Sequence, residues 1–453
     1  MNRVRPNGRM RWRCLRTGQG AFLPLLMLGA LAGPASARPR PAVASAHEVP
    51  GSPAVAIRDA AGGRLKRFYE SRGYWPLWVR GGAIRPEAAT LIGFLASADL
   101  DGLDPDRYDV AGLRHALADA RSGAPEDLAR AELMLSATFA DYVRDAKRAP
   151  SVRITYLDPA LAPARLREDE VLRTASLTPS FPAYVAAMGW MDPLYVQLRA
   201  GLGRFLAHHG PAETERIIRL NLARARILPG PWTRHVVVDA ASARLYYYGG
   251  GKLQGTMRVV VGAPQSPTPM LAGTVRYAIL NPYWNVPPDL VQRRVAPKIL
   301  QGASLTALHY EALSGWGADA QTLDPAAIDW PAVASGAQEL RVRQLPGATN
   351  AMGRMKFMFP NDLGIYLHDT PEKALMRRSA RHLSNGCVRL EDAPRLGRWF
   401  FGRPLAVPSP APEQDIALPQ PVPVYLTYLT AVPSAGGVTL LSDAYGRDGA
   451  GGR

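Results

Sequence analysis

The chain of 453 residues is 47% hydrophobic and carries a formal net charge of +16 at neutral pH. This much apolar material is enough to build two or three cores. The basic residues form no run of five or six and do not alternate with aromatic residues, so a nucleic-acid-binding protein is not expected. A positive field of this size favours an anionic partner, such as an acidic membrane surface or a carboxylate-bearing polymer.

The first 37 residues have the pattern of a secretory signal peptide. Six arginines and no acidic residue precede an apolar run, Ala21 to Gly33, that is too short to span a bilayer comfortably. Small residues suited to cleavage follow at Ala35 to Ala37. An uncleaved membrane anchor is the alternative. Removal of residues 1–37 lowers the net charge to +10 and takes away Cys14, so we expect an exported protein with Cys387 as its single thiol.

A linker and a helical region are predicted next. Residues 38–55 are rich in proline and alanine without periodicity, which is typical of a linker. Residues 56–230 then show helical spacing. Apolar residues recur every three or four positions over 131–148, and a second such segment, 214–228, follows a proline and is ended by Pro-Gly. We therefore predict a mainly helical region.

The pattern changes after residue 230. Short β-branched and aromatic segments recur without long helices between them, and three consecutive glycines, 249–251, indicate a hairpin. A mainly antiparallel β-sandwich or barrel is predicted over residues 231–433, which makes the whole chain α+β. The expected strands are 235–240, 243–248, 256–262, 274–280 and 422–430.

Two further segments stand apart from the strands. Residues 289–346 are less regular and interrupt the strand pattern. Long loops in compact domains tend to carry function, so this segment is expected to be an inserted cap or lid, with a plain surface insertion as the alternative. Residues 434–453 are expected to form a C-terminal tail.

Cys387 is the candidate nucleophile. An imidazole within hydrogen-bond reach can take the proton of a thiol and hold the resulting ion pair. His368 precedes the cysteine by nineteen positions, near the end of a strand-like segment, and His382 is a rival base. Gly386 lets N–H groups approach an oxyanion, and Ser384 could add a hydroxyl donor. A buried, inert cysteine is the alternative. The histidines show no metal-ligand spacing, so no metal site is expected.

The segment from His368 to Leu390 resembles the active-site signature of the L,D-transpeptidase (YkuD) family. A histidine in HDTP is followed, after fifteen residues, by SNGCVRL. Other segments resemble the larger periplasmic branch of that family in Gram-negative bacteria, including its N-terminal scaffold region. These segments are 67–79, 102–110, 249–271, 277–288 and 350–361.

The resemblance implies roles for the residues of the motif. Cys387 would attack the diaminopimelate carbonyl of a tetrapeptide stem, expel the terminal D-alanine and form a thioester. His368 would be the general base, with its ring oriented by the backbone carbonyl of Asp369. The N–H groups of Gly386 and Cys387 would form the oxyanion hole. A side-chain amine of a second stem would then resolve the thioester into a cross-link.

The resemblance also implies substrate contacts. Arg389 would hold either the loop or a substrate carboxylate, and a structural salt bridge is an equal alternative. Tyr366 and Trp284 would line the cleft, although aromatic residues on strands are more often core. Asn385 stands where many family members have histidine. We recognise no peptidoglycan-binding helical module, so affinity for the polymer is expected from the basic surface or from residues 289–346.

The function expected from the resemblance is a periplasmic peptidoglycan L,D-transpeptidase that needs no cofactor. Its partners would be peptidoglycan stem peptides, without nucleic acid, and an association with the inner-membrane cell-wall synthesis machinery is compatible with that role. An L,D-carboxypeptidase or endopeptidase of the same fold would pass the acyl group to water instead. A non-catalytic wall-binding scaffold is the third reading. The sequence does not indicate an oligomeric state.

Overall fold

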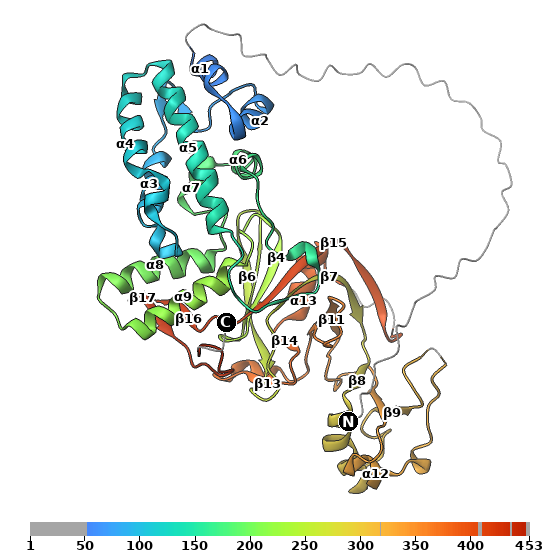
Figure 1. The fold of residues 1–453 in the computed structure, drawn as a ribbon. Coiled ribbons are helices and arrows are strands. Elements are labelled where there is room, and N and C mark those ends of the chain that lie inside the picture. The colour runs from blue at the N-terminus through green and yellow to red at the C-terminus, as the bar shows by residue number, and fades with distance from the viewer. Residues whose placement is uncertain (1–51, 318, 406–409, 435–436, 450–453) are drawn as a thin grey trace, which may run out of the picture. The chain divides into compact units, whose positions relative to one another are not determined.

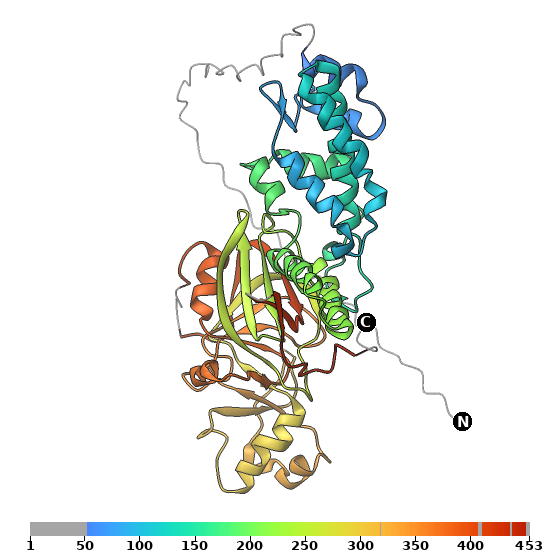
Figure 2. The same cartoon turned by 90° about the vertical axis from the view of Figure 1, so that its left-hand side faces the viewer.

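The computed structural model describes residues 52–317, 319–405, 410–434 and 437–449 (Figure 1, Figure 2). The predicted signal peptide, residues 1–37, and most of the predicted linker, residues 38–55, lie outside the described residues. The end of that linker is helical, because Ser52 caps a helix that begins at Pro53. Within the described ranges, no helix is both long enough and apolar enough to cross a membrane.

The first region of the described chain is helical, as predicted. Its longest helix buries one face through Leu135, Phe139 and Val143, which follow the helical spacing of the sequence. The second predicted helix, 214–228, is also present and begins two residues earlier. The elements are α1 (Pro53–Ala60), α2 (Gly63–Ser71), β1 (Val79–Arg80), β2 (Ala83–Ile84), α3 (Glu87–Ala96), α4 (Val110–Asp119), α5 (Pro125–Ala146), β3 (Thr155–Tyr156), α6 (Glu168–Ser176), α7 (Phe181–Ala186), α8 (Pro193–Ala207) and α9 (Ala212–Arg226).

A buried carboxylate connects α5 to the chain that enters β1. Glu132 has no exposed surface. Its Oε1 accepts hydrogen bonds from the Leu77 N–H and from the Tyr69 hydroxyl, both at 2.6 Å. Its Oε2 accepts from the N–H groups of Trp78 at 2.7 Å and Val79 at 3.0 Å. Burial raises the pKa of Glu132, and the hydrogen bonds from these donors oppose the rise. Neutral donors, and not an ion pair, therefore stabilise the buried carboxylate.

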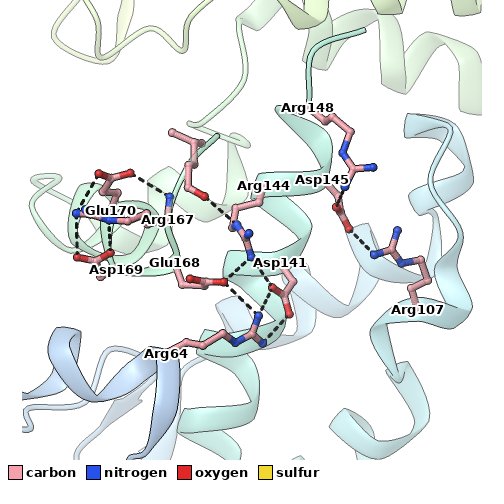
Figure 3. A network of polar contacts seen from close by, with 11 residues as sticks. Arg64, Arg107, Asp141, Arg144, Asp145, Arg148, Arg167, Glu168, Asp169 and Glu170 are labelled. Atoms are coloured by element: carbon pink, nitrogen blue, oxygen red, sulfur yellow. Dashed lines mark hydrogen bonds and ion pairs between the residues drawn. The ribbon is translucent and has the colours of Figure 1, made fainter. Parts of the chain in front are cut away.

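Ion pairs connect α5 to α2 and α6 on another side (Figure 3). Arg64 of α2 pairs with Asp141 of α5 at 2.9 Å and with Glu168 of α6 at 3.2 Å. Arg144 of α5 pairs with the same two carboxylates, and its Nε donates to the Leu166 carbonyl at 2.9 Å. The network is partly exposed, so it fixes the relative position of these helices more than it adds stability.

The second region is rich in strands and carries one long helix. Its elements are β4 (His235–Asp239), β5 (Arg244–Gly249), β6 (Lys252–Gly262), β7 (Leu271–Leu280), β11 (Met355–Met358), β12 (Leu367–His368), β13 (His382–Ser384), β14 (Val388–Leu390), α13 (Ala393–Phe401) and β15 (Gln414–Thr427). The pairing order is β11-β12-β14-β6-β5-β4-β15-β7-β3, and β11 also pairs with β7, so the sheet closes on itself. Most pairings are antiparallel, whereas β12–β14, β4–β15, β3–β7 and β6–β13 are parallel. The predicted α+β class is confirmed.

The helical and strand-rich regions share a core. Val236 and Val238 of β4 point into the core enclosed by the sheet, whereas Val237 between them packs with residues of the helices. Tyr425 of β15 also packs with the helices. Because successive side chains of a strand point to opposite faces, these strands are buried on both sides. The helical region is therefore packed directly against the sheet.

Residues 289–346 are more regular than the sequence predicts. With the strand before them they form a subdomain that has its own apolar core and a sheet in the order β8-β10-β9. Asn350 joins the two ends of this subdomain, since its Nδ2 donates to the carbonyls of Pro282 at 3.1 Å and Leu345 at 2.9 Å. The elements are β8 (Trp284–Val286), α10 (Pro288–Leu290), a π-helical turn (Val291–Val295), α11 (Ala296–Leu300), β9 (Tyr310–Leu313), α12 (Trp330–Ser335) and β10 (Arg341–Gln344).

The predicted tail, residues 434–453, is packed against the protein as far as it is described. A hairpin of β16 (Ala431–Ser434) and β17 (Gly437–Leu440) contacts α8. Further on, Asp448 pairs with Arg224 of α9 at 2.7 Å, and the Arg224 side chain is only 1% exposed. Detachment of the C-terminal segment would leave the buried charge of Arg224 without its partner Asp448. The described part of this segment therefore belongs to the folded structure.

We predict that Glu132→Gln lowers the free energy of unfolding by about 3 kcal/mol. The amide keeps the size of the side chain. Its NH₂ group, however, would face backbone N–H groups and cannot accept a hydrogen bond from them. Urea denaturation followed by circular dichroism measures the change. Glu126→Gln, in an exposed turn of the same helix, should change that free energy by less than about 1 kcal/mol. Equal losses in the two variants would contradict the assigned role.

Candidate active site

The candidate site is built on the parallel pairing of β12 with β14. Leu367 pairs with Val388, and both side chains are buried in the core of the closed sheet. Since side chains alternate along a strand, the residues on either side of these two point to the opposite face. The side chains on that face are those of Tyr366, His368, Cys387 and Arg389. The fold thus brings together residues nineteen positions apart.

Cys387 lies half-buried against a tight loop. Its Sγ donates to the carbonyl of Gly364 at 3.2 Å. Asn361 shapes this loop, because its Nδ2 donates to the Ile365 carbonyl at 2.8 Å and its Oδ1 accepts from the Ile365 N–H at 3.1 Å. Gly364 has a φ of +64°, a conformation that glycine adopts without strain. Sequence analysis did not identify Asn361, which fixes the acceptor of the thiol.

His368 is buried and its ring is held in one orientation. Its Nδ1 lies 2.6 Å from the backbone carbonyl of Asp369. A carbonyl can only accept, so Nδ1 carries the hydrogen and the lone pair of the neutral ring is on Nε2. The Asp369 side chain is itself anchored by Lys373 at 2.6 Å and by the Arg354 N–H at 3.0 Å. This tautomer is the one a general base needs.

The electrostatics of the site favour neutral groups. Burial lowers the pKa of His368 to about 3, and the positive charges of Arg389 and Lys356 act in the same direction. Desolvation by surrounding protein atoms raises the pKa of the Cys387 thiol to about 11, although Tyr366 and Arg389 oppose the rise. Among the described residues, no hydrogen bond joins Sγ to the imidazole. A thiolate–imidazolium ion pair between Cys387 and His368 is therefore not favoured in the absence of substrate.

Ser384 and Gly386 act on the loop in a way that differs from the prediction. The Ser384 hydroxyl donates to the carbonyl of Cys387 at 2.6 Å, so it is not a free donor. The Gly386 N–H donates to Ser384 Oγ at 3.2 Å and is likewise engaged. Of the two N–H groups expected in an oxyanion hole, the Cys387 N–H alone is left without an acceptor among the described residues. Gly386 has a φ of +111°, which explains the need for glycine.

Thr268 forms hydrogen bonds that hold the loop containing Gly386 and Cys387. The sequence did not single out this residue. Its Oγ1 donates to the Gly386 carbonyl at 2.8 Å and accepts from the Gly262 N–H at 2.9 Å. Tyr445 donates to the Gly262 carbonyl at 2.6 Å, and Arg447 donates to the Thr268 carbonyl at 3.1 Å. The cysteine loop is therefore connected to the C-terminal segment. No sequence motif marked Thr268, because its partners Gly386 and Arg447 are far away along the chain.

The remaining candidates are placed differently. Arg389 forms an ion pair with Glu372, which is the structural salt bridge considered above. Its positive charge also lowers the pKa of His368 and opposes the rise in the pKa of Cys387. Asn385 is exposed on the loop. Trp284 lies in β8 and packs against the core of the inserted subdomain. The Nε2 of His382 lies 2.9 Å from the Ala240 carbonyl, which engages the rival base elsewhere. Within the described ranges, no three metal-binding side chains cluster.

We predict that alkylation of Cys387 by iodoacetamide accelerates about tenfold per pH unit over roughly pH 6 to 10. A thiol with a pKa of about 11 stays mostly protonated over this range, and the small thiolate fraction that reacts grows about tenfold per pH unit. Mass spectrometry of the intact protein after timed quenching measures the rate, and circular dichroism at each pH checks the fold. A plateau over roughly pH 5 to 8 would instead indicate a thiolate–imidazolium pair.

Thr268→Val is expected to lower the free energy of unfolding by about 2 kcal/mol, because the Gly262 N–H and the Gly386 carbonyl both lose their partner. Thr268→Ser keeps the hydroxyl and should lose less than half as much. Chemical denaturation of the two variants measures both values. Equal losses would mean that the methyl group of Thr268 contributes as much as its hydroxyl, and a Thr268→Val variant as stable as the parent would contradict the role of the hydrogen bonds.

Comparison with known proteins identifies two domains in the chain. Residues 63–202 match the model of the Scaffold domain, and residues 233–401 match that of the L,D-transpeptidase catalytic domain, YkuD. A Haemophilus influenzae protein named "Putative L,D-transpeptidase" is 27% identical over 398 residues, which cover 85% of this chain and 78% of that protein.

Solved structures of L,D-transpeptidases are more distant. The Ldtfm-avibactam carbamoyl enzyme is 14% identical with a TM-score of 0.22, over 44% of this chain and 50% of that chain. An L,D-transpeptidase from Mycobacterium smegmatis is 14% identical with a TM-score of 0.21, over 43% of this chain and 58% of that chain. The chain thus spans little more than half the length of these structures. By its two matched domains, the chain belongs to the L,D-transpeptidase (YkuD) family and carries a scaffold domain in front of the catalytic domain.

Proposed function

We propose that the chain forms cross-links between peptidoglycan stem peptides through a thioester on Cys387. The observation that carries this proposal is the common strand face of Cys387 and His368, together with the Asp369 carbonyl that leaves the lone pair on Nε2. Membership of the L,D-transpeptidase family supports peptidoglycan as the substrate. The transfer chemistry itself is our inference from these residues.

The first half-reaction starts from a neutral thiol and a neutral imidazole. Substrate binding would bring Sγ and Nε2 closer, because catalytic hydrogen bonds are often long in free enzymes and tighten in the complex. Sγ of Cys387 attacks the diaminopimelate carbonyl while its proton passes to Nε2 of His368. The charge on the carbonyl oxygen is stabilised by the Cys387 N–H. The C–N bond to D-alanine then breaks, the leaving nitrogen takes the proton from Nε2, and a thioester remains.

The second half-reaction returns the enzyme to its starting state. The side-chain amine of a second stem attacks the thioester carbonyl and gives one proton to Nε2 of His368. The C–S bond breaks, and Sγ of Cys387 takes that proton back. The product is a new amide bond between two stems. Water in place of the amine would give a hydrolysed stem by the same proton transfers.

We also propose that this reaction takes place in the periplasm. The basic and apolar character of residues 1–37 supports export, as argued from the sequence. After their removal Cys387 is the single cysteine, so no second thiol of the same chain can trap it as a disulfide in an oxidising compartment. Detection of the processed chain in a periplasmic fraction tests the location.

We predict that Cys387→Ala abolishes the cross-linked product and that His368→Ala lowers its rate by about 10²-fold or more. His382→Ala is the matched control and should change the rate by less than about threefold, because that ring contacts Ala240 and Tyr445 away from the thiol. Purified protein is incubated with defined tetrapeptide stems, and the products are identified by mass spectrometry.

The products distinguish the alternatives. A dimer with loss of D-alanine supports transfer, whereas a shortened monomer indicates that water is the acceptor. Cross-linking by Cys387→Ala at the wild-type rate would refute the nucleophile. A loss in His382→Ala as large as in His368→Ala would move the base to His382. No product from any stem, with a folded wild-type protein, would favour the non-catalytic scaffold.

A further inference from the structure

The scaffold domain contains a large cavity far along the chain from the cysteine. Its volume is about 630 Å³, and it lies between the β1–β2 hairpin, α3, α4 and the 3₁₀ turn Ala120–Ser122. Small and aliphatic residues form the apolar part of its wall, including Ile84, Ile92 and Leu117. No aromatic side chain lines it. Figure 1 shows α3 and α4 in the helical region.

Three arginines supply every charged side chain of this wall. They are Arg85 at the end of the hairpin, Arg114 in α4 and Arg121 in the 3₁₀ turn. None of the three side chains makes an ion pair or a hydrogen bond with the described residues. The Nε of Arg85 is buried without an acceptor in the protein. A buried donor without an acceptor costs free energy, and a bound anion would remove that cost.

Nearby acids do not neutralise the cavity. Glu132 in the same domain is saturated by Tyr69 and three backbone N–H groups. Among the described residues, Glu87 at the start of α3 has a buried Oε2 without a hydrogen-bond partner, and Asp119 of α4 pairs with His115 and Arg130, so neither forms an ion pair with the three arginines. Arg72 adds a further positive charge close to Arg85, and its pKa is lowered by burial and, in part, by Arg85. The cavity is therefore a positive site with partly apolar walls.

We propose that this arginine cavity binds the carboxylate groups of peptidoglycan stem peptides. Guanidinium groups match carboxylates in a planar, two-point geometry. The aliphatic wall suits the methyl group of the D-alanine that such stems carry beside their carboxylates. Sugar rings and nucleic-acid bases are recognised largely by aromatic faces, which this cavity lacks. The identity of the polymer rests on the function proposed above, whereas the anion site itself does not.

The binding test uses the full mature chain with Cys387→Ala, so that turnover plays no part. Purified peptidoglycan sacculi are pelleted with increasing protein, and the bound fraction gives the affinity. The triple variant Arg85→Gln, Arg114→Gln, Arg121→Gln should bind about tenfold more weakly or worse at low salt. The control variant Arg153→Gln, Arg398→Gln, Arg403→Gln loses the same charge at exposed sites outside the cavity and should bind within about twofold of the parent.

Two further arms identify the ligand. An amidase removes the stems and leaves soluble glycan strands, which are immobilised on beads for this arm. These strands should not retain the parent protein, and anionic lipid vesicles should not replace the sacculi. Lysine at all three positions should restore only part of the binding. The positive charge is kept, whereas the planar two-point geometry of the guanidinium groups is lost. Circular dichroism and thermal unfolding verify that each variant is folded.

Several results would overturn the proposal. These are unchanged binding by the glutamine variant, an equal loss in the control variant, full binding to stem-free glycan, and stronger binding to vesicles than to sacculi. Turnover of soluble tetrapeptides is measured separately with the chain that retains Cys387 and all three arginines. If that chain gives no product while the glutamine variant still binds sacculi more weakly, the proposed function fails and the anion site stands.

Discussion

The parallel pairing of β12 with β14 is the constraint on which the candidate site depends. Leu367 and Val388 are both buried in the sheet core, and this burial fixes the register. A slip of β14 by one residue would turn Cys387 into the core and Val388 out of it. Parallel neighbours need a crossover, because a tight hairpin reverses the chain. The nineteen positions between His368 and Cys387 are therefore a consequence of topology.

The surroundings of the imidazole determine how the pair can react. Lys356 on the neighbouring strand and Arg389 both oppose protonation of His368, and burial opposes it more strongly. A base of this kind accepts a proton only when new negative charge is formed beside it, as when a thiol attacks a carbonyl. The same environment keeps Cys387 protonated at rest. Oxidising and alkylating agents react with the thiolate. The protonated thiol of Cys387 is therefore protected from both while no substrate is bound.

Much of the fold could be predicted from the sequence, but less of the site. Strand periodicity located β4 to β7 and the late strand β15, and the motif identified Cys387 and His368. The roles of Ser384 and Gly386 differ from prediction because their hydrogen bonds close within the loop itself. Thr268 bonds to a residue 118 positions away, a contact that no local pattern reveals. The inserted segment 289–346 was expected, but its regular secondary structure was not, because its helices and strands are too short to show a period.

The shared core has a consequence for how a polymer would be held. Arg224 of α9 pairs with Asp448, and the preceding residue, Arg447, donates a hydrogen bond to the carbonyl of Thr268, which supports the cysteine loop. Val237 adds packing between sheet and helices. These contacts restrict movement of the scaffold domain relative to the sheet more than a flexible linker would. A stem held in the arginine cavity, as proposed above, would then be kept within a restricted range of distances from the thiol. Such a restriction raises the effective concentration of a weakly bound polymer without any further contact at the site.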